Sequence, residues 1–202
     1  MNIGVVPARL ASKRLPKKIL ADLDGKPMVA HTMEQVLKAQ KLDKVILAID
    51  SEETFDALKD FGFDMVMTSK DHCSGTDRVA EVVKKNEDAE VIINIQGDEP
   101  LIDANIIDDL LGLFEDKDVN MGTAISTKLR VNDLLDDNVV KAIIDQDKNV
   151  IDFKRNIYDS EIGGLYRHIG IYGFRRNTLF QFSMLDQSPR EKKRKLEQMR
   201  AL

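Results

Sequence analysis

The sequence contains one cysteine, Cys73, and no tryptophan. A single cysteine cannot form an internal disulfide or the cysteine cluster of a zinc site, which fits a reducing compartment. Apolar runs long enough to span a bilayer are missing, and Met1 leads directly into a short strand-like segment instead of a signal peptide. The sequence therefore predicts a cytoplasmic protein that does not enter a membrane.

An excess of positive charge is also missing. Thirty Lys and Arg residues against 35 Asp and Glu residues give a formal net charge of −5. Proteins that bind nucleic acids or anionic membranes generally present a positive surface, so we expect neither partner. Any anionic ligand must instead meet a local cluster of cations. The 202 residues, 43% hydrophobic and 32% charged, suit one folded domain.

Strand-like and helix-like segments alternate over the first 120 residues. Short apolar runs rich in β-branched residues occupy residues 3–6, 45–49, 64–67 and 91–95. A helix-like pattern follows each run, beginning near residues 27, 52, 77 and 103. This alternation predicts an α/β fold with a mainly parallel sheet and helices on both faces.

Ligands of such sheets bind beyond the carboxyl ends of the strands. We therefore expect the functional site in the loops at 7–18, 69–78 and 96–100. Residues 121–202 have a less regular pattern, with strand-like stretches at 122–127, 139–144, 150–153 and 168–174, a Gly163-Gly164 turn, and helical spacing over 188–202. We interpret residues 1–202 as a single domain in which 121–202 extend the sheet and add a small β-rich lobe.

Five cations lie in the loop after the first strand: Arg9, Lys13, Arg14, Lys17 and Lys18. Such a concentration of positive charge suits a polyphosphate, although a solvated basic loop has the same composition. The loop lacks the Gly-Lys-Ser/Thr ending of a P-loop and the Gly-x-Gly-x-x-Gly turn of a dinucleotide site. The pattern thus excludes ordinary P-loop ATPases and dehydrogenases.

The segment Gln96-Gly97-Asp98-Glu99-Pro100 follows the most apolar strand of the sequence. Mg²⁺ can bridge a carboxylate in this position to substrate phosphates, which makes Asp98 the candidate metal ligand. Gln96 carries both a donor and an acceptor and can bind a polar substrate edge. An ordinary Gly-Asp turn explains the same pattern equally well.

Two further segments contain candidate ligand contacts. Ser74 is an N-cap candidate, and Arg78 places a cation in the first turn of the following helix, where it does not stabilise the helix dipole. Arg78 is therefore more plausible as a ligand contact. His168 opens a strand, a position in which a histidine is more often structural than catalytic. The three histidines form no cluster with the spacing of zinc ligands.

Six segments taken in order resemble the 3-deoxy-manno-octulosonate cytidylyltransferases, the CMP-Kdo synthetases. They read VVPARLASKRLPKK, DGKPM, SGTDR, NIQGDEPLI, RHIGIY and KLEQMRAL. The resemblance implies a Rossmann-like nucleotidyltransferase fold, with residues 1–120 as the nucleotide-binding half and 121–202 as the half for sugar binding and dimerisation. It also implies transfer of CMP from CTP to the acidic sugar Kdo for lipopolysaccharide synthesis, with Mg²⁺ as cofactor, in a homodimer.

The resemblance assigns a role to each matching residue. Arg9, Arg14 and Lys18 would hold the triphosphate, and Arg14, Lys18 and Asp98 would be catalytic. Ala8, Ser74 and Arg78 would line the cytosine pocket, and Asp98 would bind Mg²⁺. The residues facing the sugar acid would be Gln96, Arg155, His168, Tyr172 and Glu197.

Two alternatives remain open from the sequence. The acceptor could be another acidic sugar, such as 8-amino-Kdo or a compound related to sialic acid. The second alternative is a non-catalytic nucleotide-binding module. It arises because the family continues past Leu202 through a Val-Asp-Thr-like segment whose aspartate completes the metal site, and we expect the chain to be truncated before that segment.

Overall fold

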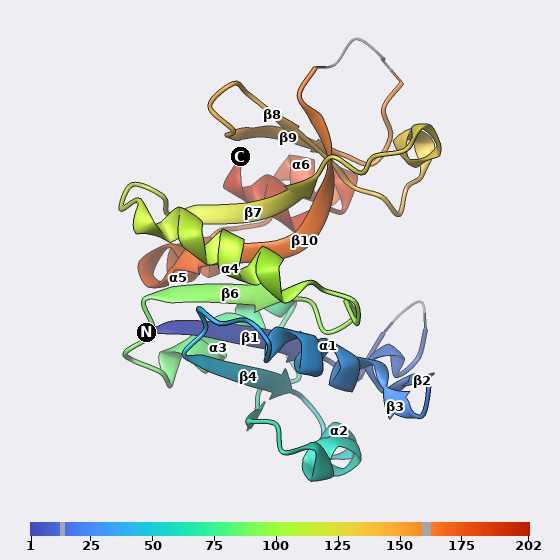
Figure 1. The fold of residues 1–202 in the computed structure, drawn as a ribbon, viewed down its shortest axis with the longest axis vertical. Helices are drawn as coiled ribbons and strands as arrows, with labels where there is room; N and C mark the ends of the chain where they lie inside the picture. The colour runs from blue at the N-terminus through green and yellow to red at the C-terminus, as the bar shows by residue number, and fades with distance from the viewer. Residues whose placement is uncertain (13–14, 159–162) are drawn as a thin grey trace. The chain divides into compact units, whose positions relative to one another are not determined.

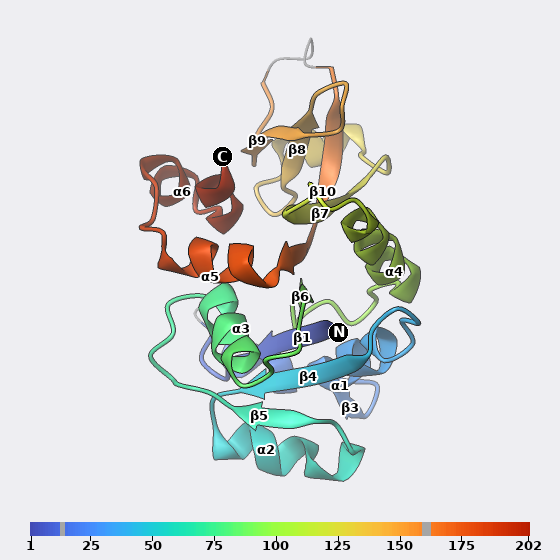
Figure 2. The ribbon, with the colours of Figure 1, turned by 90° about the vertical axis from the view of Figure 1, so that its left-hand side faces the viewer.

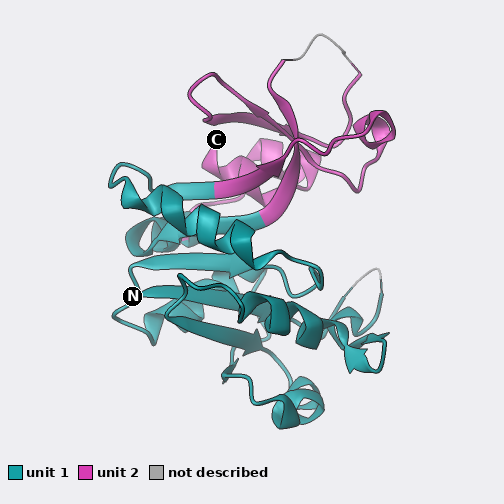
Figure 3. Ribbon diagram, in the orientation of Figure 1, with its two compact units in different colours: residues 1–122, 171–183 teal, residues 123–170, 184–202 magenta. Residues whose placement is uncertain are grey.

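The structure is a computed structural model that describes residues 1–12, 15–158 and 163–202. Its contacts divide the chain into two compact units (Figure 3). Unit 1 comprises residues 1–122 and 171–183, and unit 2 comprises residues 123–170 and 184–202. This division differs from the sequence halves because residues 171–175 pair with a strand of the first half and so bring the chain back into unit 1.

Unit 1 contains sheet strands in the order β5-β4-β1-β6-β10 (Figure 1). The parallel strands are β1 (Asn2–Ala8), β4 (Lys44–Ile49), β5 (Met65–Met67) and β6 (Val91–Ile95). Residues 171–175 of β10 (Leu165–Arg175) pair antiparallel with β6. The predicted α/β fold with a mainly parallel sheet is therefore confirmed.

Helices cover both faces of this sheet (Figure 2). One face carries α1 (Met28–Val36) and α4 (Ala104–Gly112), and the other carries α3 (Gly75–Lys84) and α5 (Arg176–Met184). The short α2 (Glu52–Leu58) connects β4 to β5. Burial on both faces explains why β6 is apolar at nearly every position. Among the described residues, no helix has the length and apolarity needed to cross a bilayer.

Side-chain caps fix where three of these helices begin. The Ser51 Oγ accepts a hydrogen bond from the Thr54 N–H, and the Asp103 side chain accepts one from the Asn105 N–H. Ser74 and Asp77 form a capping box at the start of α3. The caps of α2 and α3 place both helix starts at the edge of the sheet where the parallel strands end.

Two features of the second half differ from the sequence prediction. The sequence pattern predicts no helix over residues 176–184, where the structure has α5. This helix follows β10 without a loop, so no turn signal marks its start. The predicted helix over 188–202 is divided into α6 (Pro189–Arg194) and a 3-10 turn at Glu197–Ala201. The division occurs at Lys195, which adopts a left-handed conformation with φ of 54°. A lysine gives no sequence warning of a conformation that usually selects glycine or asparagine.

Unit 2 combines antiparallel strands with α6. It contains β8 (Lys141–Ile144), β9 (Val150–Lys154), residues 165–170 of β10 and most of β7 (Met121–Ser126). Its core is built from Ala142, Phe153, Leu196 and Met199. The fully buried ammonium of Lys141 donates to the carbonyl oxygens of Asp136, Val139 and Arg155.

The turn before the unit 2 part of β10 depends on one glycine. Gly164 has φ of 69°, and a Cβ at this position would collide with the carbonyl oxygen of Ile144. We therefore expect Gly164→Ala to lower the free energy of unfolding by about 2–4 kcal/mol, from the cost of left-handed backbone and the collision. Urea unfolding measures this loss. Gly163→Ala is the matched control, because its Cβ would meet nothing within 4 Å; equal midpoints for the two variants would contradict the prediction.

Candidate active site

The carboxyl ends of four parallel strands lie at one edge of the unit 1 sheet. Ala8 at the end of β1 pairs with Ile49 at the end of β4, which in turn pairs with Met67 at the end of β5. The loops that follow approach each other closely: a Cβ on Gly75 would lie 3.3 Å from the Pro7 Cγ and 3.9 Å from the Gln96 Nε2. The loops at 7–18, 69–78 and 96–100 thus meet at this edge, as the strand pattern predicts.

Lys18 and Asp98 form an ion pair across this edge. The Lys18 Nζ lies 2.5 Å from the Asp98 Oδ2, and the two side chains are 33% and 37% exposed. The structure therefore joins a predicted phosphate-binding cation to the predicted metal ligand, from loops 80 positions apart in the sequence. Their exposure leaves both groups accessible to a ligand.

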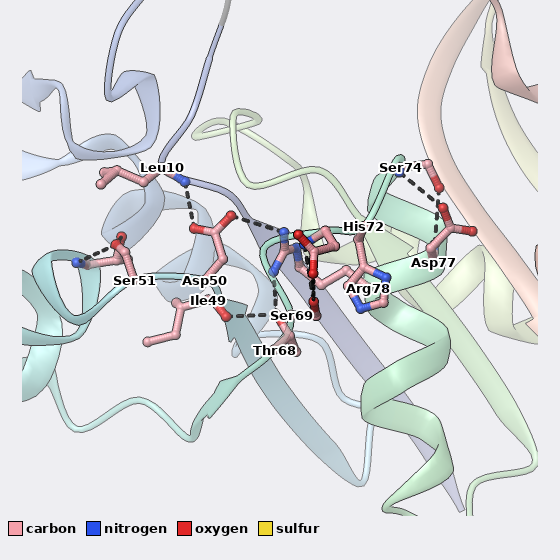
Figure 4. Close-up of polar contacts among 12 residues, drawn as sticks. Leu10, Ile49, Asp50, Ser51, Thr68, Ser69, His72, Ser74, Asp77 and Arg78 are labelled. Atoms are coloured by element: carbon pink, nitrogen blue, oxygen red, sulfur yellow. Dashed lines mark hydrogen bonds and ion pairs between the residues drawn. The ribbon is translucent and has the colours of Figure 1, made fainter.

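A second, buried ion pair lies at the ends of β4 and β5 (Figure 4). The Arg78 Nη2 lies 3.0 Å from the Asp50 Oδ2, and Arg78 also donates to the Thr68 Oγ1. The Thr68 hydroxyl donates to the Ile49 carbonyl oxygen at 2.7 Å. Burial lowers the pKa of the Arg78 guanidinium, and the Asp50 carboxylate opposes this shift.

Arg78 is only 2% exposed. The family resemblance predicts that it lines the cytosine pocket, whereas the structure places its guanidinium in the interior, bound to two side chains. Its visible role is to join α3 to the ends of β4 and β5. Direct contact with a base stays a prediction.

The other nucleotide-site candidates of unit 1 occupy different surroundings. Arg9 is exposed and lines a pocket of about 610 Å³ together with Leu10, Ala11, Ser12, Pro16, Lys17, Asp50, Ser51 and Lys70. Ala8 is fully buried at the end of β1. The Ser74 Oγ accepts the Asp77 N–H at 3.1 Å, so its hydroxyl is engaged in the cap of α3. Arg14 lies outside the described residues.

Two predicted sugar contacts also belong to unit 1. The Gln96 Nε2 lies 3.5 Å from the Asn94 Oδ1, directly after β6. Tyr172 pairs in register with Asn94 across the β6–β10 ladder and packs, half-buried, against the core. Gln96 and Tyr172 thus both lie beside Asn94, one just after β6 and the other on β10.

The remaining predicted sugar contacts lie in unit 2. Arg155 donates to three backbone carbonyl oxygens, those of Asp137, Arg194 and Lys195. These bonds connect the end of β9 to a loop and to the end of α6, which gives Arg155 a clear structural role. Glu197 opens the 3-10 turn that follows α6. A contact with the sugar stays a prediction for both residues.

His168 is buried and neutral. It is 9% exposed, and burial lowers its pKa to about 4. The His168 Nε2 lies 2.9 Å from the Thr123 Oγ1, and the ring packs edge-on against Phe153. At neutral pH the imidazole therefore carries no charge. This environment is typical of a histidine with a structural role.

This burial predicts a pH dependence of stability. The folded-state pKa of His168 lies below its unfolded value, so the unfolded chain binds more protons between about pH 6.5 and pH 4. The free energy of unfolding should fall by up to about 3 kcal/mol across this window, and His168→Gln should lack that contribution. Denaturant unfolding of both proteins at several pH values measures the difference. A constant difference from pH 7.5 to pH 4 would contradict the prediction.

Asp50 is a residue of this edge that the sequence motifs do not single out. Its neighbour Ser51 caps α2. The structure shows that Asp50 instead accepts hydrogen bonds from Arg78 and from the Leu10 N–H. The available signal was the position of this carboxylate directly after a parallel strand, the same signal that identified Asp98.

The donor set around Asp98 is compatible with a shared Mg²⁺ ion. In the described part of the chain, no group of three or more His, Cys, Asp or Glu residues could hold a metal alone. Mg²⁺ is commonly bound by one or two carboxylates together with substrate phosphates and water. Asp98, partly exposed and beside a cation suited to phosphate, fits an ion that is held jointly with a nucleotide.

A mainly parallel sheet with cations and a carboxylate at its carboxyl edge is the arrangement of an α/β nucleotidyltransferase. The family model described as "Cytidylyltransferase" matches residues 3–202. A 3-deoxy-manno-octulosonate cytidylyltransferase of Geobacter sulfurreducens is 39% identical over 219 residues, covering 100% of this chain and 87% of the relative. The enzyme of the same name from Solibacter usitatus is 43% identical over 209 residues, covering 99% of this chain and 81% of that relative.

A solved structure supports the same relationship. The structure of CMP:2-keto-3-deoxy-manno-octonic acid synthetase complexed with CTP has a TM-score of 0.90 and 34% identity, covering 98% of this chain and 84% of that one. The chain belongs to the 3-deoxy-manno-octulosonate cytidylyltransferase family.

Proposed function

We propose that this protein transfers CMP from CTP to Kdo, with release of pyrophosphate, for lipopolysaccharide synthesis. The observation that carries the proposal is the Lys18–Asp98 pair at the carboxyl edge of the sheet. It joins a cation suited to phosphate to a carboxylate suited to Mg²⁺, in a chain whose curated relatives have this activity as their name. Both substrates are small molecules.

The reaction requires little covalent chemistry from the protein. A hydroxyl oxygen of the sugar attacks the α-phosphorus, the bond to the bridging oxygen of the β-phosphate breaks, and the hydroxyl proton is released. Catalysis then rests on positioning and on charge stabilisation at the phosphate oxygens. Lys18 and Arg9, with Arg14 from outside the described residues, supply positive charge for the triphosphate.

Asp98 is the residue proposed to hold Mg²⁺. When bound, the ion neutralises charge on the phosphate oxygens. The Lys18 ammonium lies 2.5 Å from the Asp98 Oδ2, so a phosphate bound by Lys18 would lie close to the proposed metal ligand.

The sugar contacts are proposed from the family resemblance and from residue chemistry. Gln96 and Tyr172 offer neutral hydrogen-bonding groups in unit 1. In unit 2, Arg155 is the cation suited to the sugar carboxylate, and Glu197 is suited to hydroxyl groups. Because His168 is neutral, its proposed contact is a hydrogen bond and not an ion pair.

Cytoplasmic location and a homodimer belong to the same proposal. The single cysteine, Cys73, is compatible with a reducing compartment. The family resemblance supports the dimer. Light scattering on the purified protein would decide the oligomeric state, and a mass of about one 22.9 kDa chain would reject the dimer.

An acceptor panel tests the proposed reaction. Pyrophosphate release is measured with CTP and, in turn, Kdo, 8-amino-Kdo and a sialic acid. We expect turnover with Kdo to exceed the others, because the curated relatives are named for this substrate. Faster turnover with another acidic sugar would transfer the assignment to that sugar. CTP binding without any product would identify a non-catalytic nucleotide-binding module.

A further inference from the structure

The buried carboxylate of Asp50 connects three parts of the carboxyl edge. Its Oδ2 accepts from the Arg78 Nη2 at 3.0 Å, and its Oδ1 accepts from the Leu10 N–H at 2.9 Å. Figure 4 shows both bonds converging on this one side chain. Asp50 thereby connects the loop after β1, the end of β4 and the first turn of α3.

The Leu10 bond controls the beginning of the basic loop. Leu10 directly follows Arg9, and both residues line the same pocket as Asp50. A fixed Leu10 amide limits the backbone rotations that would otherwise move the Arg9 side chain. The acceptor thus holds the backbone at the point where the loop leaves β1, next to its first cation.

The Arg78 bond keeps this acceptor in place. The side chains of Arg78 and Asp50 are 2% and 9% exposed, so neither charge is compensated by solvent. The Arg78 guanidinium is itself held by Thr68, whose hydroxyl is bound to the Ile49 carbonyl oxygen. Because each group is fixed by the next, the Asp50 carboxylate has little freedom to rotate away from Leu10.

We infer that Asp50 is a positioning residue for nucleotide binding, acting through the Leu10 amide on the neighbouring Arg9. Its two carboxylate oxygens are engaged by the Leu10 amide and by Arg78. This inference rests on the proposed function, since CTP is the ligand that the loop is expected to bind. It assigns to Asp50 a role in substrate affinity that is separable from its contribution to stability.

Three variants of the full chain test this inference. Asp50→Ala removes both acceptors, and Asp50→Asn keeps one oxygen that can serve Leu10 or Arg78 but not both. Glu191→Gln is the matched control, because Glu191 forms an equally buried pair with Arg200 in unit 2, at 2.6 Å with side chains 5% and 6% exposed. For each protein, calorimetry measures CTP affinity and hydrogen exchange measures protection of the Leu10 amide.

We expect Asp50→Ala to raise the Kd for CTP about tenfold, as expected for loss of roughly one hydrogen bond, and to accelerate exchange at Leu10. Asp50→Asn should show smaller changes in both measurements. Glu191→Gln should lower the unfolding midpoint but change neither the Kd for CTP nor the exchange rate at Leu10. Wild-type affinity in Asp50→Ala, or equal weakening in Glu191→Gln, would overturn the inference.

Failure of the proposed function gives a different pattern. If the wild-type protein does not bind CTP, the nucleotide assignment is wrong whatever the variants do. Exchange at Leu10 then decides the remaining question. If the Leu10 amide exchanges at the wild-type rate in Asp50→Ala, the positioning role is wrong as well. If exchange is faster, Asp50 still orders the Leu10 backbone, but not for CTP.

Discussion

Asp98→Asn is expected to lower the rate of pyrophosphate release from CTP and Kdo by about 10²–10³-fold, the scale seen when one transition-state stabilising group is removed. The proposed metal loses its carboxylate ligand, and charge on the phosphate oxygens is less well neutralised. The affinity of Asp98→Asn for CTP in metal-free buffer should equal or exceed that of wild type, because Lys18 no longer shares its charge with Asp98. Steady-state kinetics and calorimetry together measure this separation.

Glu34→Gln is the matched control for Asp98→Asn. Glu34 forms an ion pair with Lys26 at 2.6 Å in the same unit, with side chains that are 40% and 43% exposed. Removing such an exposed pair costs at most about 1 kcal/mol of stability. Turnover should therefore remain close to wild type. Unchanged turnover in Asp98→Asn, or an equal loss in Glu34→Gln, would contradict the metal assignment.

Lys18→Ala is expected to reduce kcat/KM for CTP by about 10²-fold, because a charge directed at the triphosphate is lost from both the bound and transition states. Lys18→Arg, which keeps the charge, should recover part of the loss. The free energy of unfolding should change by no more than about 1 kcal/mol, since the Lys18–Asp98 pair is partly exposed. Kinetics at varied CTP concentration measure the effect.

Lys26→Ala is the control for Lys18→Ala. It removes a lysine from a comparable ion pair, that of Lys26 with Glu34, and neither residue is a predicted phosphate or metal contact. Wild-type kcat/KM is expected. A loss of similar size in both variants would show that general surface charge, and not the position of Lys18, governs CTP binding.

The sheet of unit 1 could be predicted because its signals are local. Each buried parallel strand is a short apolar run, and residues such as Ser51 and Ser74 mark helix starts immediately beyond the strand ends. Asp98 became a candidate site residue on the same basis, as a carboxylate that follows a strand. These predictions depend on periodicity and position alone, which a single sequence contains.

The parts that sequence could not provide depend on contacts between distant residues. Arg78 has the local pattern of a ligand contact. Only its tertiary contact with Asp50, 28 positions away in the sequence, shows that it belongs to a buried ion pair. The left-handed Lys195 and the pairing of residues 171–175 with β6 likewise depend on tertiary structure. Motif matching therefore found the groups at the sheet edge but not the network that positions them.

The central claim is that the carboxyl edge of unit 1 binds the triphosphate of CTP through Lys18 and shares Mg²⁺ with it through Asp98. Calorimetric titration of CTP with and without Mg²⁺, on wild type, Lys18→Ala and Asp98→Asn, tests it most directly. Wild type should bind CTP more tightly with Mg²⁺ than without it. Asp98→Asn should still bind CTP but lose this enhancement, and Lys18→Ala should bind CTP weakly in both buffers. Wild-type behaviour of both variants, or no CTP binding by wild type, would contradict it.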